Sequence, residues 1–328
     1  MTGPSLNQLR ALGEVFPAGA RSAEPGLVVG RERELIEVVQ TLQTPGLCPI
    51  IFGPKGIGKS TLAWQAELVA KGNTAVLDGL GAARYGDVSE FFYETFWVDC
   101  SRLPTPNGES ILAAVADHLR RRLTQTAKLT PAEQTVNVSL GLSPQIGLTR
   151  RYTAAPAAPT AGIDAEIIDL ATEVTVESGN PLLFIVDDLD LVPNARALAT
   201  FLKLVAGTSP TELRFLLAGT ATRLGDLLPD YWQLARIAIP ITLDVMLDTD
   251  LLRMLNRGVE RLYEQGLQFT VEDDLLTSLV RIAAGSPSIA SQLARDSIRA
   301  AERAGNVRVT RNHLDTALRD MLIALRPG

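Results

Sequence analysis

The stretch from Pro49 to Thr61 reads PIIFGPKGIGKST, an apolar strand that runs directly into the pattern G-x-x-x-x-G-K-S. Glycines in this pattern allow backbone conformations closed to other residues, so that several N–H groups can converge on phosphate oxygens at the start of the following helix. Lys59 is then expected to reach the β- and γ-phosphates, and the Ser60 hydroxyl to ligate Mg²⁺. The flanking strand and helix favour this interpretation over a plain glycine-rich turn. The predicted nucleotide-binding residues of the loop are Gly53, Pro54, Lys55, Gly56, Ile57, Gly58, Lys59, Ser60 and Thr61.

A second apolar run, residues 182–186, ends in the acidic sequence DDLD at 187–190. A continuous apolar run is typical of a strand buried on both faces of a parallel sheet, and such sheets bind ligands at the carboxyl ends of their strands. Asp187 is therefore predicted to hold Mg²⁺ through its water shell, and Asp188 to polarise the water that attacks the γ-phosphate. An acidic turn is the alternative for both, and a helix N-cap would explain Asp190 equally well.

Residues 214–220 read RFLLAGT, another central strand with a polar tip. Thr220 is predicted to hydrogen-bond the γ-phosphate or the lytic water, although a threonine that closes a strand is also common. Arg223 and Arg236 are candidates to stabilise the charge that develops during phosphate cleavage. For either, a surface arginine is the alternative. As a catalytic group, Arg236 would be a finger that reaches the phosphate of a neighbouring subunit.

These segments predict an α/β fold: a P-loop NTPase three-layer sandwich with a parallel sheet, followed by a small all-helical lid domain. Residues 1–25, rich in Gly, Pro and Ala, are expected to be a loose lead-in. The core is placed at 26–244. From Val245 onward the strand signals stop and helix-period apolar stripes take over, so the lid is placed at 245–328.

The segment 127–163 is longer than a compact crossover requires, since about ten to a dozen residues suffice. Apolar and polar residues alternate over 136–142 and 146–148, with Ser143-Pro144 between them. This pattern is typical of a β-hairpin. The hairpin is either packed on its own domain or an element that docks a partner or forms an oligomer.

Composition narrows the class of protein. A net charge of −6 over 328 residues argues against a surface that coats DNA in general. Two cysteines and two histidines are too few for a disulfide framework or a zinc site. No basic stretch followed by an apolar run opens the chain, and no run approaches the roughly 18 apolar residues of a membrane helix. We therefore expect a cytoplasmic protein with no membrane partner.

The order of the signals resembles the AAA+/STAND superclass of P-loop ATPases. VGRERE at 29–34 and the tryptophan-bearing FWVD at 96–99 are similar to the signal-transduction ATPases with numerous domains, whereas 307–325 resembles the lid of origin-recognition-type initiators, without a winged helix. The resemblance implies ATP and Mg²⁺ as cofactors. It further implies that Val29, Gly30 and Arg31 border the adenine and that Pro287 packs on the base or ribose side.

Two positions depart from the AAA+ pattern. Many AAA+ lids carry a sensor arginine three residues after the glycine at Gly285, where this chain has Ser288, and Arg295 is a candidate substitute on the same helix. Asp188 stands where many members have glutamate, whose longer arm reaches water more readily. Both departures predict slow hydrolysis.

The favoured function is a Mg-ATP-binding, slowly hydrolysing molecular switch of AAA+/STAND type that controls its own oligomerisation or a separately encoded effector protein. A DNA-binding initiator or loader ATPase is the alternative, supported by the initiator-like lid and by arginines at 299, 303, 308 and 311. Nucleic acid is possible but not favoured, because the overall charge is acidic. A nucleotide-binding scaffold without turnover is a third interpretation. A small-molecule kinase has the least support, because no substrate-pocket motif accompanies the loop.

Overall fold

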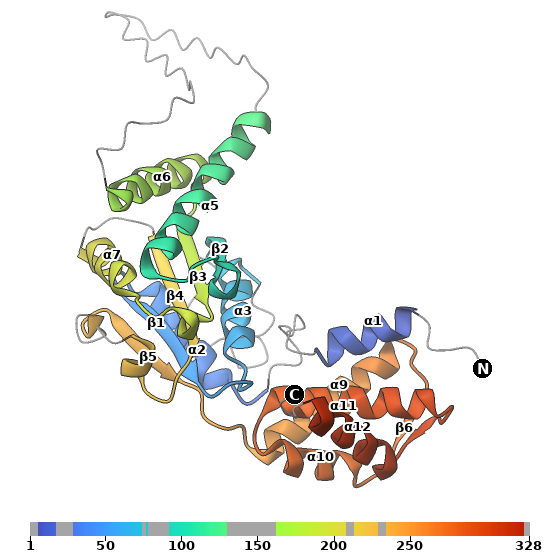
Figure 1. Cartoon of the computed structure of the whole chain (residues 1–328). Helices are drawn as coiled ribbons and strands as arrows, with labels where there is room; N and C mark the ends of the chain where they lie inside the picture. Colours follow the sequence, from blue (N-terminus) through green and yellow to red (C-terminus); the bar gives the residue numbers. More distant parts are fainter. Residues whose placement is uncertain are drawn as a thin grey trace, which may run out of the picture.

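The structure is a computed structural model that describes residues 6–17, 29–73, 77, 92–129, 162–207, 213–228 and 234–324. Figure 1 shows one part built around a sheet and a second, helical part that follows the last strand of that sheet. The hairpin predicted within 127–163 lies outside the described residues.

The sheet consists of five parallel strands in the order β2-β3-β4-β1-β5. Because the strands are parallel, their carboxyl ends meet at one edge. At that edge Gly53 lies opposite Thr220, and Asp99 lies opposite Asp187. The register therefore places the glycine-rich loop and the acidic strand end near each other. The strands are β1 (Cys48–Gly53), β2 (Glu94–Asp99), β3 (Leu182–Asp187), β4 (Leu213–Thr220) and β5 (Ala238–Thr242).

Helices cover both faces of the sheet. Alternate residues of a strand point to opposite faces. Ile51 belongs to the apolar cluster that includes residues of α2 and α3, while Ile50 belongs to the cluster that includes residues of α5, α6 and α7. Every residue of β3 is buried, as its continuous apolar run predicts. These layers confirm the predicted three-layer sandwich. Helices α2 (Glu32–Gln43) and α3 (Lys59–Ala70) form one outer layer; α5 (Gly108–Leu129), α6 (Ile163–Ser178) and α7 (Arg196–Gly207) form the other.

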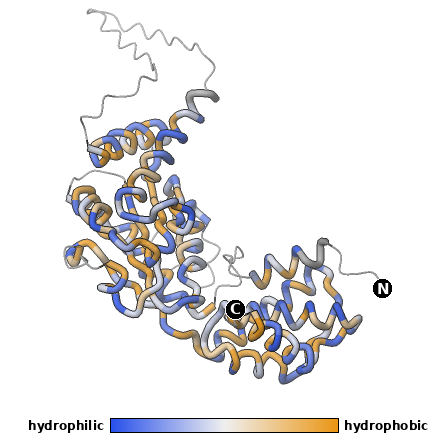
Figure 2. Tube along the Cα trace, in the orientation of Figure 1, coloured by the Kyte–Doolittle hydropathy of each residue, from blue (hydrophilic) through white to orange (hydrophobic). Residues whose placement is uncertain are grey.

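The helical part has an apolar core of its own, which includes Leu255, Leu279, Leu293 and Leu314. Figure 2 shows hydrophobic stretches alternating with hydrophilic ones along its helices. A short parallel ribbon, β6 (Thr270–Val271) with β7 (Arg308–Val309), is a small departure from the all-helical lid that was expected. No helix within the described ranges is both long and apolar enough to cross a membrane. The helices are α9 (Asp248–Glu264), α10 (Leu275–Ala283), α11 (Pro287–Arg303) and α12 (Arg311–Ala324).

The prediction of a loose lead-in over residues 1–25 was wrong for the described part of that segment. Helix α1 (Leu6–Val15) lies beside α9 and packs on it. Leu12, Val15 and Phe16 are buried in the core of the helical part. Their spacing of i, i+3 and i+4 places all three on one face of a helix, and that face is covered by a part of the chain more than 230 residues away.

Candidate nucleotide-binding site

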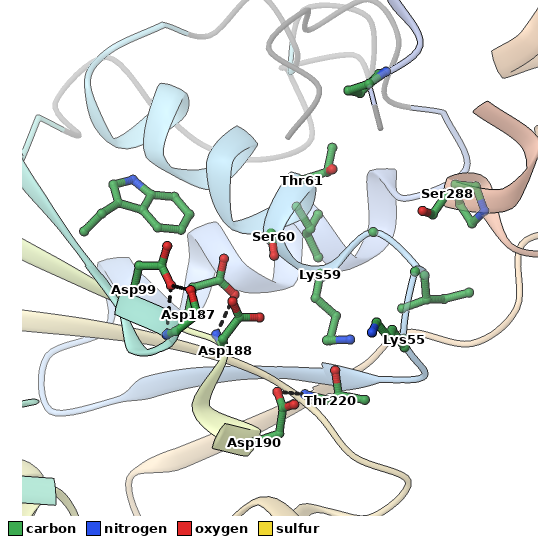
Figure 3. A pocket seen from close by; sticks show the side chains of 18 of the residues that line it. Lys55, Lys59, Ser60, Thr61, Asp99, Asp187, Asp188, Asp190, Thr220 and Ser288 are labelled. Atoms are coloured by element: carbon green, nitrogen blue, oxygen red, sulfur yellow. Dashed lines mark hydrogen bonds between the residues drawn. The ribbon is translucent and has the colours of Figure 1, made fainter. Parts of the chain in front are cut away.

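A cavity of about 1190 Å³ opens at the carboxyl edge of the sheet and extends to the helical part. Figure 3 shows Lys59 and Ser60 at the start of α3, on the side of the cavity that faces Asp187 and Asp188. The structure thus brings together side chains from both ends of the sequence. The predicted site residues that line the cavity are Val29, Arg31, Lys55, Gly56, Ile57, Gly58, Lys59, Ser60, Thr61, Asp187, Asp188, Thr220 and Pro287.

The loop between β1 and α3 has the backbone that the glycine pattern predicts. Gly56 and Gly58 adopt φ values of 77° and 103°, the left-handed region in which side chains are disfavoured. The Lys59 ammonium donates hydrogen bonds of 3.2 Å to the Gly53 carbonyl and 2.9 Å to the Pro54 carbonyl. Burial lowers the pKa of Lys59, and the carboxylates at 187, 188 and 190 oppose that shift. The ammonium is therefore held by neutral carbonyls, which phosphate oxygens can replace.

The two carboxylates at the end of β3, Asp187 and Asp188, have different surroundings. Asp187 is only 3% exposed, and its Oδ1 accepts a hydrogen bond of 3.0 Å from the Asp188 N–H. Asp188 has a left-handed backbone with φ of 56°. Burial is the main cause that raises the pKa of Asp188, and the nearby carboxylates of Asp187, Asp99 and Asp190 raise it further. A cation beside this group of carboxylates would offset their repulsion.

The oxygen donors at this end of the cavity fit Mg²⁺. Magnesium prefers carboxylate, hydroxyl, phosphate and water oxygens, and it usually takes few protein ligands. The Ser60 hydroxyl and the Asp187 carboxylate supply that kind of donor set, and both line the cavity. These two residues would hold the metal.

Asp190 links the ends of two strands and does not cap a helix. Its Oδ1 accepts a hydrogen bond of 2.7 Å from the Thr220 N–H. Asp190 lies inside the short helix Leu189–Leu191, whose N-cap residue is Asp188. The N-cap explanation of Asp190 was therefore wrong. Its bond fixes Thr220 beside the loop and leaves the Thr220 side chain on the cavity wall.

The helical part touches the loop directly. The Ser288 N–H donates a hydrogen bond of 3.2 Å to the Gly56 carbonyl, and the Ser286 hydroxyl donates one of 3.4 Å to the same oxygen. Ser288 is the residue at the position where an AAA+ sensor arginine was expected. Arg295 does not replace it, because its side chain is buried, pairs with Asp296 at 2.9 Å and does not line the cavity.

Four predicted site residues do not line the cavity: Gly30, Gly53, Pro54 and Arg236. Gly53 and Pro54 contribute through their carbonyls, which hold Lys59. Arg236 is exposed and precedes β5 at the amino edge of the sheet, where the Ile237 carbonyl accepts from Cys48 N–H. It does not reach the cavity of its own chain, so its role toward a neighbouring subunit stays a prediction.

Several cavity residues were missed. Trp97 and Asp99, two residues apart on β2, face the cavity together, and His118 of α5 joins them. The FWVD motif at 96–99 carried a family resemblance, but it does not indicate which of its side chains border the cavity. At the other end lie Phe16 of the N-terminal segment and Met254 of α9. Nothing in the local sequence marks these two as site residues, because the cavity wall forms only when α1 and α9 pack.

A buried carboxylate positions Trp97. Glu67 of α3 accepts hydrogen bonds of 2.6 Å from Trp97 Nε1, 2.6 Å from Thr95 Oγ1 and 2.7 Å from Lys71 Nζ. Its side chain is only 4% exposed. Glu67 therefore ties the helix that begins at Lys59 to the strand that carries Trp97.

No protein-family profile and no curated protein sequence matches the chain. Among solved structures, the Aeropyrum pernix ORC1 protein in complex with DNA is similar with a TM-score of 0.61 and 16% identity, over 94% of this chain and 69% of that chain. The ORC2 protein of the same organism, solved as ADPNP-ADP complexes, has a TM-score of 0.59 and 17% identity, over 94% of this chain and 71% of that chain. Cdc6p from Pyrobaculum aerophilum has a TM-score of 0.55 and 14% identity, over 96% of this chain and 74% of that chain.

The fold is that of the ORC and Cdc6 proteins. This result confirms the predicted P-loop NTPase fold and its likeness to the fold of origin-recognition proteins. The finer likeness to the signal-transduction ATPases stays a prediction. At identities of 14 to 17%, the similarity establishes the architecture, and the chemistry has to be argued from the cavity.

Proposed function

We propose that this chain is a Mg-ATP-binding AAA+ ATPase of the initiator or loader class, which binds nucleic acid under the control of its nucleotide. The cavity carries the nucleotide part of the proposal: the glycine-rich loop, Lys59 and the carboxylates of the acidic strand end line one space. Fold likeness supports the initiator part, because the match to the DNA-bound ORC1 protein spans 94% of the chain and so includes the helical part.

The cavity residues divide the work of hydrolysis between them. Loop N–H groups and Lys59 would bind the phosphates, while Ser60 and Asp187 would hold Mg²⁺. The bound ion would neutralise part of the phosphate charge. Asp188 would accept a proton from the attacking water, and Thr220, fixed by Asp190, would orient that water or the γ-phosphate.

The contact between Ser288 and Gly56 supplies the coupling to the lid. A phosphate that binds the loop N–H groups fixes the orientation of the loop peptides, and the Gly56 carbonyl belongs to one of them. Phosphate binding would therefore shift the equilibrium between lid positions, and this coupling needs no sensor arginine. To move a two-state equilibrium from 1:99 to 99:1, the nucleotide must bind one state better by about 5.5 kcal/mol.

Fluorescence anisotropy with labelled duplex DNA tests the initiator class. Wild type and Lys59→Ala are titrated with ADP or with a non-hydrolysable ATP analogue at several salt concentrations. We expect wild-type affinity to depend on the nucleotide and to fall steeply as salt rises, because phosphate contacts release counterions. Lys59→Ala should lose the dependence on nucleotide. A wild type that binds the analogue but no DNA at low salt would refute the initiator class.

A nucleotide-controlled switch that acts on its own assembly or on a partner protein is the second candidate. The net charge of −6 and the exposed position of Arg236 favour it. In that case specific ATPase activity should rise with protein concentration and the Arg236→Ala variant should lose the rise. Arg319→Ala, an exposed arginine of α12, is the control. A mass by light scattering that stays monomeric with the analogue would count against assembly.

A further inference from the structure

Two arginine side chains reach the cavity, and they differ in mobility. Within the described part of the chain, the arginines that line it are Arg31 and Arg102. Arg31 is 7% exposed, and its guanidinium is held by the Glu34 carboxylate at 3.0 Å and by the Asp244 carbonyl. The side chain of Arg102 is 85% exposed and forms an ion pair with Asp99. Arg31 is therefore fixed in place, whereas Arg102 has little packing to lose if it moves.

Arg102 lies next to the carboxylates at the end of β3. It is the last residue of the short helix η4 (Cys100–Arg102), which directly follows β2. Its Nε lies 3.0 Å from Asp99 Oδ2, and Asp99 lies opposite Asp187 in the register of β2 and β3. Figure 3 shows both carboxylates at the same end of the cavity. Burial is the main cause that raises the pKa of Asp188, and the Asp99 carboxylate adds to it, so the two are close.

The ion pair between Arg102 and Asp99 is easy to exchange for another partner. Exposed ion pairs contribute little to stability, because water screens them and both side chains lose rotamer freedom. The pair is made through Nε, and a guanidinium carries further N–H groups on Nη1 and Nη2, in a fork that fits phosphate oxygens. Asp99 would keep an acceptor role without Arg102, since its Oδ1 accepts a hydrogen bond of 3.0 Å from the Ser101 N–H.

Hydrolysis develops negative charge close to these carboxylates. Water forms a bond to the γ-phosphorus while the bond from that atom to the bridging oxygen breaks. Asp188 takes the proton, and the electron pair of the broken bond stays on the β-phosphate, which gives ADP and inorganic phosphate. Charge spreads over the γ-phosphoryl oxygens in the transition state. Lys59 lies on the loop side of the cavity, so a second cation from the Asp99 side would offset repulsion by the carboxylates.

We propose that Arg102 is a catalytic residue in cis: its guanidinium leaves Asp99 and contacts the γ-phosphoryl oxygens of the nucleotide bound in its own chain. The inference rests on the proposed function and adds to it an arginine that neither Ser288 nor Arg295 supplies. Asp99 holds the guanidinium beside the site until the nucleotide binds.

Steady-state kinetics with substitutions on both sides of the ion pair test the proposal. Arg102→Ala is expected to lower kcat for ATP about 10²–10³-fold, because a group that stabilises the transition state is lost. Asp99→Asn breaks the same pair but still accepts from the Ser101 N–H that caps η4, so it should lose much less. Equal losses in the two variants would overturn the proposal, since the pair would then act as a structural unit.

Arg261→Ala is the matched control for the loss of an exposed arginine. Arg261 pairs with Glu264 three residues along α9 and does not line the cavity. We expect this variant to keep the kcat of wild type. A loss as large as that of Arg102→Ala would overturn the proposal, because removal of any surface arginine would then have the same effect.

A transition-state analogue gives a readout without turnover. Mg-ADP with aluminium fluoride places a planar fluoride complex where the transferred phosphoryl group would lie. Arg102→Ala should bind Mg-ADP as wild type does and bind the aluminium fluoride complex about a hundredfold more weakly. Equal affinity of variant and wild type for the complex would overturn the proposal, and so would a parallel loss for both ligands.

A mixing experiment separates action in cis from action in trans. Lys59→Ala keeps Arg102 but lacks the ammonium that would bind phosphate, whereas Arg102→Ala keeps that ammonium. For an arginine that acts in cis, phosphate release by the mixture should equal the sum of the two variants alone. Release above that sum would assign Arg102 to the site of a neighbouring subunit and overturn the proposal.

Wild-type behaviour separates this inference from the function on which it rests. If wild type and Arg102→Ala hydrolysed ATP at the same rate, the inference would fail and the proposed function would stand. A wild type that bound Mg-ATP but released no phosphate would overturn the inference and leave nucleotide binding standing. A wild type that bound no Mg-ATP would overturn both.

Discussion

The N–H of Ser288 donates a hydrogen bond of 3.2 Å to the carbonyl oxygen of Gly56, which joins the start of helix α11 to the phosphate-binding loop. The first N–H groups of a helix have no acceptor within the helix. A carbonyl of the loop satisfies one of them here, and Ser286 adds its hydroxyl to the same oxygen. Loop geometry and lid position are therefore linked through one peptide group.

Alanine substitutions at two loop glycines should separate this link from loop strain. Gly56 and Gly58 both have left-handed backbones, so either substitution strains the loop by roughly 1–3 kcal/mol. Only at Gly56 would the new Cβ press on the lid, at 3.1 Å from the Ser288 Cβ. We expect hydrogen exchange of the Ser288 amide to accelerate in Gly56→Ala and to stay slow in Gly58→Ala.

Equal exchange rates in the two variants would show that the amide is protected by something other than the loop. Nucleotide affinity should fall in both variants, because both distort the phosphate cradle. That shared loss is the internal control for strain.

Asp188→Asn should separate binding from hydrolysis. Asparagine tolerates the left-handed backbone of Asp188 nearly as well as aspartate, so the turn is preserved while the proton acceptor is lost. General-base catalysis contributes about 10²–10⁴-fold. Phosphate release should fall by at least about a hundredfold, with ATP affinity retained. A variant that hydrolysed at the wild-type rate would remove Asp188 from the mechanism.

The buried Glu67 should matter far more to stability than its exposed partner. Glu67→Ala removes the acceptor of the Trp97 and Thr95 hydrogen bonds, and we expect a loss of about 3 kcal/mol in the free energy of unfolding. Lys71 is 49% exposed on its side chain, so Lys71→Ala should cost about 0.5 kcal/mol. Urea denaturation measures both. Similar losses for the two variants would contradict the proposed role of Glu67.

Glu302 of α11 should make stability depend on pH. Burial raises the pKa of Glu302 in the folded state, and its Oε2 has no hydrogen-bond partner. The folded chain thus holds the proton more tightly than the unfolded chain, so stability is fully present below the unfolded pKa and falls as pH rises through the folded pKa. The Glu302→Gln variant has no carboxyl group to titrate at this position, so its stability does not fall in this way as pH rises. Its free energy of unfolding should match wild type near about pH 4 and exceed it at about pH 7.

The sequence predicts the parts of this protein whose signals are local. The glycine pattern and Lys59 lie within a dozen residues of each other, and the apolar run before Asp187 identifies a central strand by itself. Parallel pairing then leaves one edge at which both can meet. The three-layer sandwich and most of the cavity follow from these local signals.

The remainder depends on packing between distant segments. Phe16 shows the helical spacing that α1 requires, but its burial depends on the absence of a side chain at Gly258. Arg295 has the residue type of a sensor, and only the fold shows that it turns to Asp296. Ser288 acts through its backbone N–H, a role that no side-chain pattern can reveal.

Calorimetric titration of Mg-ATP into wild type and Lys59→Ala tests the central claim most directly. Lys59 is 8% exposed and donates to two loop carbonyls, so its loss removes the buried positive charge that would meet the phosphates. The account predicts saturable binding to wild type and a loss of at least about a hundredfold in affinity for the variant, since hydrogen bonds to charged groups contribute about 1.5–3 kcal/mol each. No heat of binding with wild type, or equal affinity for both proteins, would contradict it.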